Sequence, residues 1–90
     1  MTREPWALNW SGPAVRQLSR LPESVAAAII ETVDAIKENP RRVGKPLRWE
    51  LEERWVARRG QYRVMYRFDE SQRRIEVLSV GHRSDIYRRR

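Results

Sequence analysis

The sequence predicts an α+β domain in which one strand, a helical hairpin and three further strands follow one another. Three observations predict this β-α-α-β-β-β order. Apolar residues recur every three or four positions between residues 14 and 38, as on the buried side of helices. From residue 54 onward apolar and polar residues alternate, as in half-buried strands. Short polar loops separate the last three strands, so we expect a small, mainly antiparallel sheet with the hairpin packed on one face.

The N-terminal half supplies the first strand and both helices. The Trp-rich segment 6–10 alternates loosely and is expected to form a short strand. A Ser-Gly-Pro sequence then signals a helix start, and we expect the first helix at residues 14–20. A Leu-Pro pair ends this helix, because the residue before a proline is disfavoured in the helical conformation. The second helix is expected at residues 23–38 and ends at an Asn-Pro pair.

The C-terminal half supplies the rest of the sheet. Residues 41–48 are rich in Arg, with Lys, Gly and Pro, and are expected to form a basic loop. Strands are expected at residues 54–59, 62–68 and 74–80, and Gly81 is expected to end the last one. On this last strand, alternation places Ile75 and Val77 on one face and Glu76, Leu78 and Val80 on the other.

Alternation also assigns the two faces of the sheet. We expect the helices to cover the more apolar face, which carries Tyr62, Val64, Tyr66 and Phe68. The other face is then open, and adjacent strands place basic side chains on it at Arg54, Arg58, Arg63 and Arg67. Because like charges on neighbouring strands repel, such a face suits a polyanion, and we expect nucleic acid. The alternatives are a solvated face with Arg stems packed over the sheet, or an acidic protein partner.

Composition narrows the classes of function. Ninety residues fit one domain, so we expect residues 1–90 to form a single unit. With no Cys and a single His, the chain has no disulfide, iron–sulfur cluster or thiolate zinc site, and we expect neither a metal nor another cofactor. The longest apolar run, residues 25–30, is too short to span a membrane, and no signal sequence is recognisable. We therefore expect a cytoplasmic protein.

The positive charge is concentrated in the second half of the chain. The sequence has 19 basic and 12 acidic residues, a net charge of +7. Nearly all of the basic residues are Arg, whose planar guanidinium binds phosphate in a bidentate manner. Beyond the residues assigned to catalysis below, we expect five basic residues to bind nucleic acid, which the resemblance described below implies to be RNA: Lys45, Arg48, Arg54, Arg59 and Arg67.

A His-Arg pair and a Tyr follow the last predicted strand. His82 can move a proton near neutral pH, Arg83 can neutralise a developing phosphorane, and Tyr87 can stack on a base. Taken singly, His82 is better explained as a turn residue, and Tyr87 has an alternative explanation as a residue that packs the tail against the sheet. Together, the three side chains indicate acid–base chemistry on a phosphodiester.

Two motifs carry a resemblance to a known family. They are Arg-x-Gly-x-Tyr-Arg-x-x-Tyr at residues 58–66 and Val-Gly-His-Arg-x-x-x-Tyr at residues 80–87. With them the chain resembles the RelE branch of the RelE/ParE toxin superfamily over its whole length, and its actinobacterial and mycobacterial members most closely. The resemblance implies a small sheet packed against a helical hairpin. It also implies a toxin that cuts messenger RNA in the A site of the 70S ribosome without a metal, by attack of the ribose 2′-hydroxyl on the phosphate and departure of the 5′-oxygen.

The resemblance assigns roles to individual residues. It implies that Arg63 contacts the scissile phosphate, Arg83 stabilises the transition state and Tyr87 stacks on or orients the message. Arg58 matches a basic residue of the preceding strand, where a well-characterised relative has lysine. Because a guanidinium does not readily give up a proton, we expect His82 to take part of the role of general base.

Two other functions remain open at this point. One is a ParE-like toxin that binds and inhibits DNA gyrase, and the other is a catalytically weak RNA-binding member of the same fold. The set of His82, Arg83 and Tyr87 favours cleavage, because the ParE branch usually lacks it. The resemblance further implies an acidic, partly disordered antitoxin that covers the basic face or displaces the Tyr87 region, giving a toxin–antitoxin hetero-oligomer.

Overall fold

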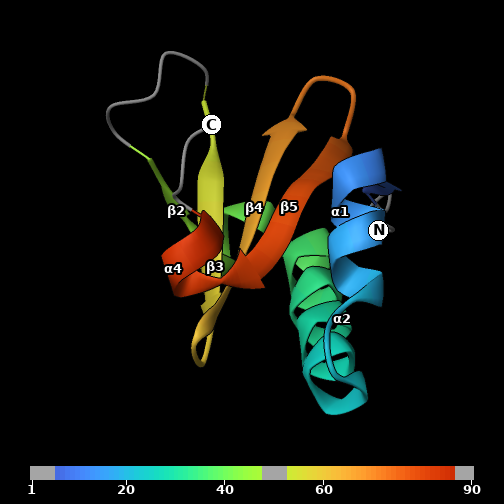
Figure 1. The fold of residues 1–90 in the computed structure, drawn as a ribbon. Coiled ribbons are helices and arrows are strands. Elements are labelled where there is room, and N and C mark those ends of the chain that lie inside the picture. Colours follow the sequence, from blue (N-terminus) through green and yellow to red (C-terminus); the bar gives the residue numbers. More distant parts are fainter. Residues whose placement is uncertain (1–5, 48–52, 87–90) are drawn as a thin grey trace.

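The computed structural model describes residues 6–47 and 53–86 and has the predicted α+β class (Figure 1). The strands are β1 (Ala7–Trp10), β2 (Lys45–Pro46), β3 (Trp55–Arg59), β4 (Tyr62–Asp69) and β5 (Arg74–His82). The helices are α1 (Gly12–Ser19), α2 (Glu23–Glu38), α3 (Pro40–Val43) and α4 (Arg83–Ile86). Among these helices, none is long and apolar enough to cross a membrane.

The strands form one sheet in the order β1-β5-β4-β3-β2. β1 lies parallel to β5, and the other neighbours are antiparallel, as the meander of short loops predicts. A side chain reinforces the parallel pair, because the Ser11 hydroxyl donates to the Leu78 carbonyl (2.9 Å) and also accepts from the Ala14 N–H at the start of α1. The first and last strands of the chain are therefore held side by side.

The predicted basic loop at residues 41–48 contains regular structure, so this prediction is wrong in part. The Asn39 side chain accepts a hydrogen bond from the Arg41 N–H (3.2 Å), and this cap starts the short helix α3. After α3 the chain returns to the sheet, where Lys45 pairs with Val56 to begin strand β2. A two-residue strand leaves no alternation to detect in the sequence.

The helices cover the apolar face of the sheet, as predicted. Val64 and Tyr66 are fully buried and belong to one core cluster with Ile29 and Val33 of α2. The Tyr66 hydroxyl donates to the Pro40 carbonyl (2.6 Å), so this buried side chain also anchors α3 to the sheet. In Figure 1, α1 and α2 lie together to the right of β3 and β4.

The pairing of β4 with β5 contains a bulge that changes the predicted alternation. Met65 pairs with Ser79 and the next residue, Tyr66, pairs with Val77, so β5 has one extra residue at this point. The extra residue turns Val80, which is only 2% exposed, into the same core as Val77. The prediction that placed Val80 on the opposite face is therefore wrong. β5 also continues through Gly81 to His82 instead of ending at the glycine.

Candidate functional site

Two arginines lie directly opposite each other on adjacent strands. Arg58 of β3 pairs with Arg63 of β4, while the next pair along, Ala57 and Val64, faces the helices. Side chains alternate along a strand, so both arginines belong to the face of the sheet opposite α1 and α2, here called the outer face. A pair of like charges in this register is unfavourable for folding, which points to a role in binding anions.

Arg63 is unusually buried for a cation, with 8% of its surface exposed. Its Nη1 donates to the carbonyls of Gly60 and Tyr62, each at 3.0 Å, so the guanidinium is held against the turn between β3 and β4. No carboxylate of residues 6–47 or 53–86 pairs with it. The two carbonyls therefore fix its position without neutralising its charge.

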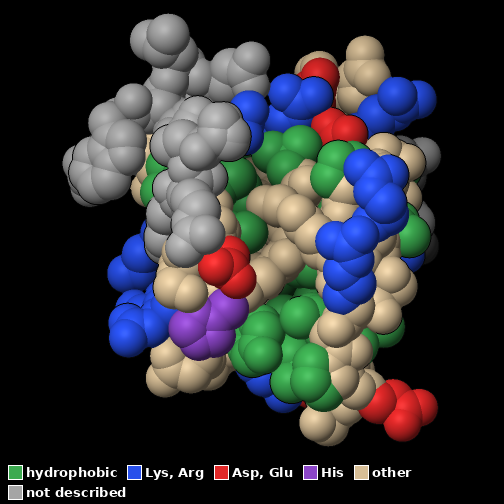
Figure 2. Space-filling model, viewed as in Figure 1, with side chains coloured by type: hydrophobic (Ala, Val, Ile, Leu, Met, Phe, Trp, Pro, Cys, Tyr) green, Lys and Arg blue, Asp and Glu red, His purple; other side chains and the backbone are tan. Residues whose placement is uncertain are grey.

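Arg83 reaches the same end of the sheet from helix α4. Its backbone N–H donates to the Gln61 carbonyl in the β3–β4 turn (2.8 Å), and its side chain is exposed. Three elements thus bring Arg58, Arg63 and Arg83 to one corner of the molecule, here called the arginine corner. Figure 2 shows basic side chains at the surface beside the single histidine, coloured purple.

His82 lies next to this corner but on the other side of β5. It pairs with Tyr62, whose ring it meets edge-on at 5.6 Å between centroids, whereas Arg63 pairs with Gly81. The Ser84 N–H donates to Nδ1 of His82 (3.1 Å), and the Ser84 hydroxyl lies 2.9 Å from the same atom. A backbone N–H can only donate, so the lone pair of the neutral imidazole is at Nδ1 and Nε2 carries the proton. Because this lone pair is already used by Ser84, the geometry does not support His82 as the general base for a phosphodiester bound at Arg63.

Two further predicted RNA-binding residues lie on the outer face. Lys45 is exposed and pairs with Val56, on the same face as Arg58. Arg54 extends over the sheet, with Nη1 3.8 Å from the Met65 sulfur. The centre of this face is more covered than expected, because Val56 is only 7% and Met65 only 9% exposed. The prediction of an open face is therefore wrong at the centre of the outer face. The Arg54 side chain lies against Met65, and helix α4 packs on β4 and β5.

Two other predicted RNA-binding arginines are paired with acids. Arg67 lies on the outer face and bonds to Glu76 of β5 through two nitrogens, at 3.0 and 3.1 Å. Arg59 points the other way, where it bonds to Glu31 (2.9 Å) and Thr32 (3.3 Å) of α2. Arg59 therefore lies on the face opposite Arg58, its neighbour along the strand, and its predicted binding of RNA remains a prediction.

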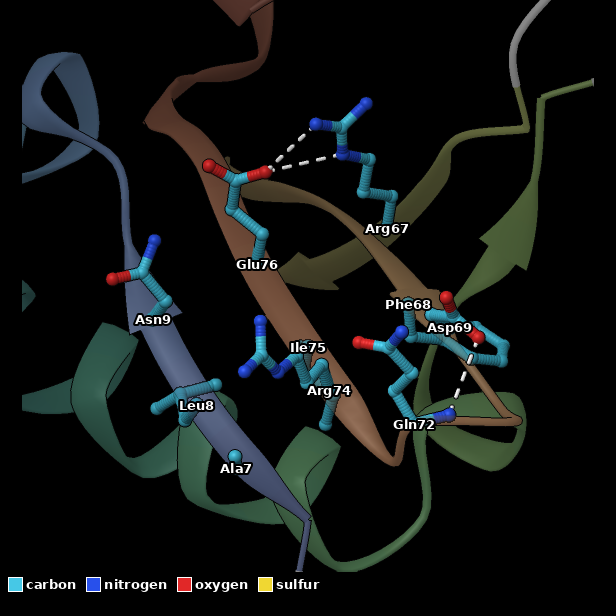
Figure 3. A pocket seen from close by; sticks show the side chains of 10 residues that line it. All are labelled: Ala7, Leu8, Asn9, Arg67, Phe68, Asp69, Gln72, Arg74, Ile75 and Glu76. Atoms are coloured by element: carbon cyan, nitrogen blue, oxygen red, sulfur yellow. Dashed lines mark hydrogen bonds and ion pairs between the residues drawn. The ribbon is translucent and has the colours of Figure 1, made fainter.

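The two remaining predicted site residues, Arg48 and Tyr87, lie outside the described residues. The ranges that the structure describes contain no group of three or more His, Asp or Glu side chains that could hold a metal ion. The shape of the molecule adds one feature that was not predicted, a hollow of about 620 Å³ on the outer face between β1, β5 and β4 (Figure 3).

The sequence profile described as "ParE toxin of type II toxin-antitoxin system, parDE" matches residues 8–87. Toxin RelG of Mycobacterium tuberculosis is 43% identical over 86 residues, which cover 94% of this chain and 99% of the relative. This chain belongs to the RelE/ParE family of type II toxins. Toxin RelE of the same organism is 45% identical over 85 residues, or 93% of this chain and 88% of the relative.

Solved structures show the same fold for this RelE-family toxin. The toxin–antitoxin complex RelBE2 of M. tuberculosis contains a chain that superposes with a TM-score of 0.80 at 39% identity, covering 88% of this chain and 99% of that one. The isolated RelE toxin of E. coli has a TM-score of 0.74 at 23% identity, covering 91% of this chain and 90% of that one. The predicted resemblance and fold are confirmed.

Sequence reasoning missed the hollow of this RelE-family toxin. Its polar lining includes Asn9 of β1, Gln72 of the β4–β5 turn and Arg74 of β5. These residues belong to no motif, and Asn9 becomes a neighbour of Gln72 and Arg74 only through the parallel pairing of β1 with β5. The sequence signal that could have found this hollow is alternation, which puts Asn9 on the face opposite the core residue Trp6.

Proposed function

We propose that this RelE-family toxin is an endoribonuclease that cuts messenger RNA in the ribosomal A site. The observation that carries the proposal is the arginine corner, where the buried and positioned guanidinium of Arg63 is at the same end of the sheet as two arginines with exposed side chains, Arg58 and Arg83. Arg63 binds the scissile phosphate in this proposal, and Arg58 and Arg83 approach the same phosphate from the neighbouring strand and from α4. The curated relatives at 43% and 45% identity are named RelG and RelE toxins, which supports the RelE type of activity.

The chemistry follows from charge. The ribose 2′-oxygen attacks the adjacent phosphorus, the bond from phosphorus to the 5′-oxygen breaks, and a cyclic phosphate remains on the upstream fragment. Negative charge accumulates on the phosphoryl oxygens as the five-coordinate state forms, and fixed guanidiniums stabilise it. The 2′-hydroxyl proton passes to solvent and the leaving oxygen regains one. His82 is not included in this route, because its lone pair faces Ser84.

Single-turnover cleavage of a translated message on ribosomes tests the proposal. Loss of one fixed donor to a transition state lowers rates by about 10²–10³-fold, so we expect a loss of that order for Arg63→Ala and Arg83→Ala. Arg63→Lys keeps the charge and part of the packing, so it serves as a second variant in case Arg63→Ala fails to fold. Arg20→Ala, at an exposed position between α1 and α2, is the control and should cleave normally. Equal cleavage by all four variants would reject the proposal.

The sequence also predicts that His82→Ala cleaves RNA much more slowly. The cleavage rate of this variant distinguishes two mechanisms. If His82 were the base, its loss would match that of Arg63→Ala. With its lone pair held by Ser84, we expect a much smaller effect of His82→Ala on the rate of cleavage.

Gyrase inhibition is a second candidate, because the matching sequence profile is described as a ParE toxin. Primer extension on a translated message and a gyrase supercoiling assay distinguish the two activities. Cuts at codon positions with normal supercoiling support the ribonuclease, and defective supercoiling without cuts supports the gyrase inhibitor.

We further propose an antitoxin as partner. The RelBE2 structure, which contains a similar chain, is described as a toxin–antitoxin complex. An acidic segment would complement the net charge of +7 and compete with RNA for Arg58 and Arg83. Co-expression with a neighbouring acidic open reading frame, followed by affinity purification of the pair, tests this partner.

A further inference from the structure

The hollow on the outer face lies at the opposite end of β4 from the arginine corner. Its walls come from three adjacent strands, because Asn9 of β1 pairs with Glu76 of β5, and Glu76 pairs with Arg67 of β4. Figure 3 shows the side chains of Asn9, Arg74 and Gln72 along its floor and rim. Its volume of about 620 Å³ is in the range of small-ligand sites, roughly 300–1,000 Å³.

Part of the polar lining is already occupied by internal bonds. Asp69 accepts hydrogen bonds from the turn that follows it, at Ser71 and Gln72. Arg67 and Glu76 bond to each other, and the bond uses Oε1 of Glu76. Within the described ranges, the side chains of Asn9, Gln72 and Arg74 form no hydrogen bond, although the charge of Arg74 acts on its cross-strand neighbour Asp69. Two amides and a guanidinium are thus available to a ligand.

The charge of the lining indicates an uncharged ligand. Arg67 and Arg74 balance Asp69 and Glu76, so a phosphate or an acidic peptide placed here would meet two carboxylates. Asn and Gln amides present a donor and an acceptor side by side, and this pair matches the edge of a nucleobase. The planar guanidinium of Arg74 offers a surface for stacking. Single-stranded RNA presents bases that are free to be stacked and hydrogen-bonded in this way.

We infer that this hollow binds a nucleobase of the same RNA strand whose phosphate lies at the arginine corner. The inference rests on the proposed function for the identity of the RNA. Arg63 and Arg67 are four residues apart on β4, or about 13 Å, so the base belongs to a nucleotide outside the cleaved bond. Asn9 and Gln72 then set a sequence preference, and the arginine corner supplies the chemistry.

The test uses RNA that cannot be cleaved. The four trinucleotides UAU, UCU, UGU and UUU with 2′-O-methyl riboses lack the attacking hydroxyl. They are titrated into the toxin while the side-chain NH₂ signals of Asn9 and Gln72 are followed by NMR. We expect both signals to shift, with one middle base bound at least about fivefold more tightly than the weakest. The double variant Asn9→Ala/Gln72→Ala should lose this difference, and Arg20→Ala should keep it.

The outcomes separate this inference from the proposed function, because binding is read without cleavage. If the trinucleotides bind and shift the signals of Asn9 and Gln72, but the toxin does not cleave a translated message on ribosomes, the nuclease is rejected and the base site is kept. Trinucleotides that leave both signals unchanged overturn the base site, and so does a middle-base preference that survives in the double variant. A shift produced only by an acidic peptide also overturns it, and assigns the hollow to a protein partner. Both substituted residues are exposed, so unfolding curves of the variants should match the parent protein.

Discussion

Replacing Arg58 by Gln should stabilise the protein while impairing RNA cleavage. Arg58 is directly opposite Arg63, and paired side chains have Cβ atoms about 5 Å apart. Like charges in this position destabilise a sheet by about 0.2–1 kcal/mol, and the exposure of Arg58 lets solvent screen much of the repulsion. We therefore expect Arg58→Gln to raise the free energy of unfolding by about 0.5 kcal/mol, which is about 2–4 °C in Tm for a domain of this size.

The neighbouring residue offers a matched control. Arg59→Gln removes the same charge but breaks the bonds to Glu31 and Thr32, so its Tm should fall slightly or stay unchanged. Thermal unfolding by circular dichroism measures both variants at low salt and at 1 M salt. At 1 M the screening length is about 3 Å, so the gain for Arg58→Gln should shrink there. A lower Tm for Arg58→Gln, or a gain that is equal at both salt concentrations, would contradict the repulsion argument.

Three further predictions concern the core and the cap. Tyr66→Phe should cost about 1–3 kcal/mol in urea unfolding, because it leaves the buried Pro40 carbonyl without its donor. Burial raises the pKa of Tyr66 from 10 to about 12. Its contribution to the free energy of unfolding should therefore be complete below pH 10 and be lost as the pH rises to 12. An equally steep fall in the free energy of unfolding of Tyr66→Phe between pH 10 and pH 12 would contradict this. Gly44→Ala should destabilise by about 1–3 kcal/mol, since the new Cβ would meet the Tyr66 hydroxyl and lie 2.9 Å from a β3 carbonyl; an unchanged urea midpoint would show that the loop moves. Ser11→Ala should cost about 1 kcal/mol by removing the cap of α1, measured by the same unfolding curves, with Ser11→Thr retaining most of it.

The parts of the fold that alternate regularly were predictable from the sequence. Residues 62–68 alternate without interruption, and the structure buries Val64 and Tyr66 under the helices as expected. The bulge in β5 was not predictable from alternation, because one inserted residue exchanges the two faces for everything beyond it. The short strand β2 was missed for a related reason, since its two residues owe their conformation to pairing with β3 rather than to their own pattern.

The candidate site was predictable as a set of charges and less so as a geometry. Parity placed Arg58 and Arg63 on the same face, and the structure pairs them directly. The position of His82 depends on where β5 ends and which way its last residue points, and its hydrogen bonds to Ser84 depend on α4. Arg59 was assigned to RNA from its charge, but its partner Glu31 is 28 residues away in α2 and becomes a neighbour only on folding.

The parallel pairing of β1 with β5 has a consequence for synthesis of the protein. β1 leaves a translating ribosome well before its hydrogen-bonding partner β5, and the Ser11–Leu78 bond closes a loop of 67 residues. Contacts so distant along the chain slow folding and must wait for the C-terminal strand. Arg83 follows that strand directly, so an incomplete chain lacks both the finished sheet and the last arginine of the corner. The sheet and the arginine corner can therefore form only after β5 and Arg83 have been synthesised.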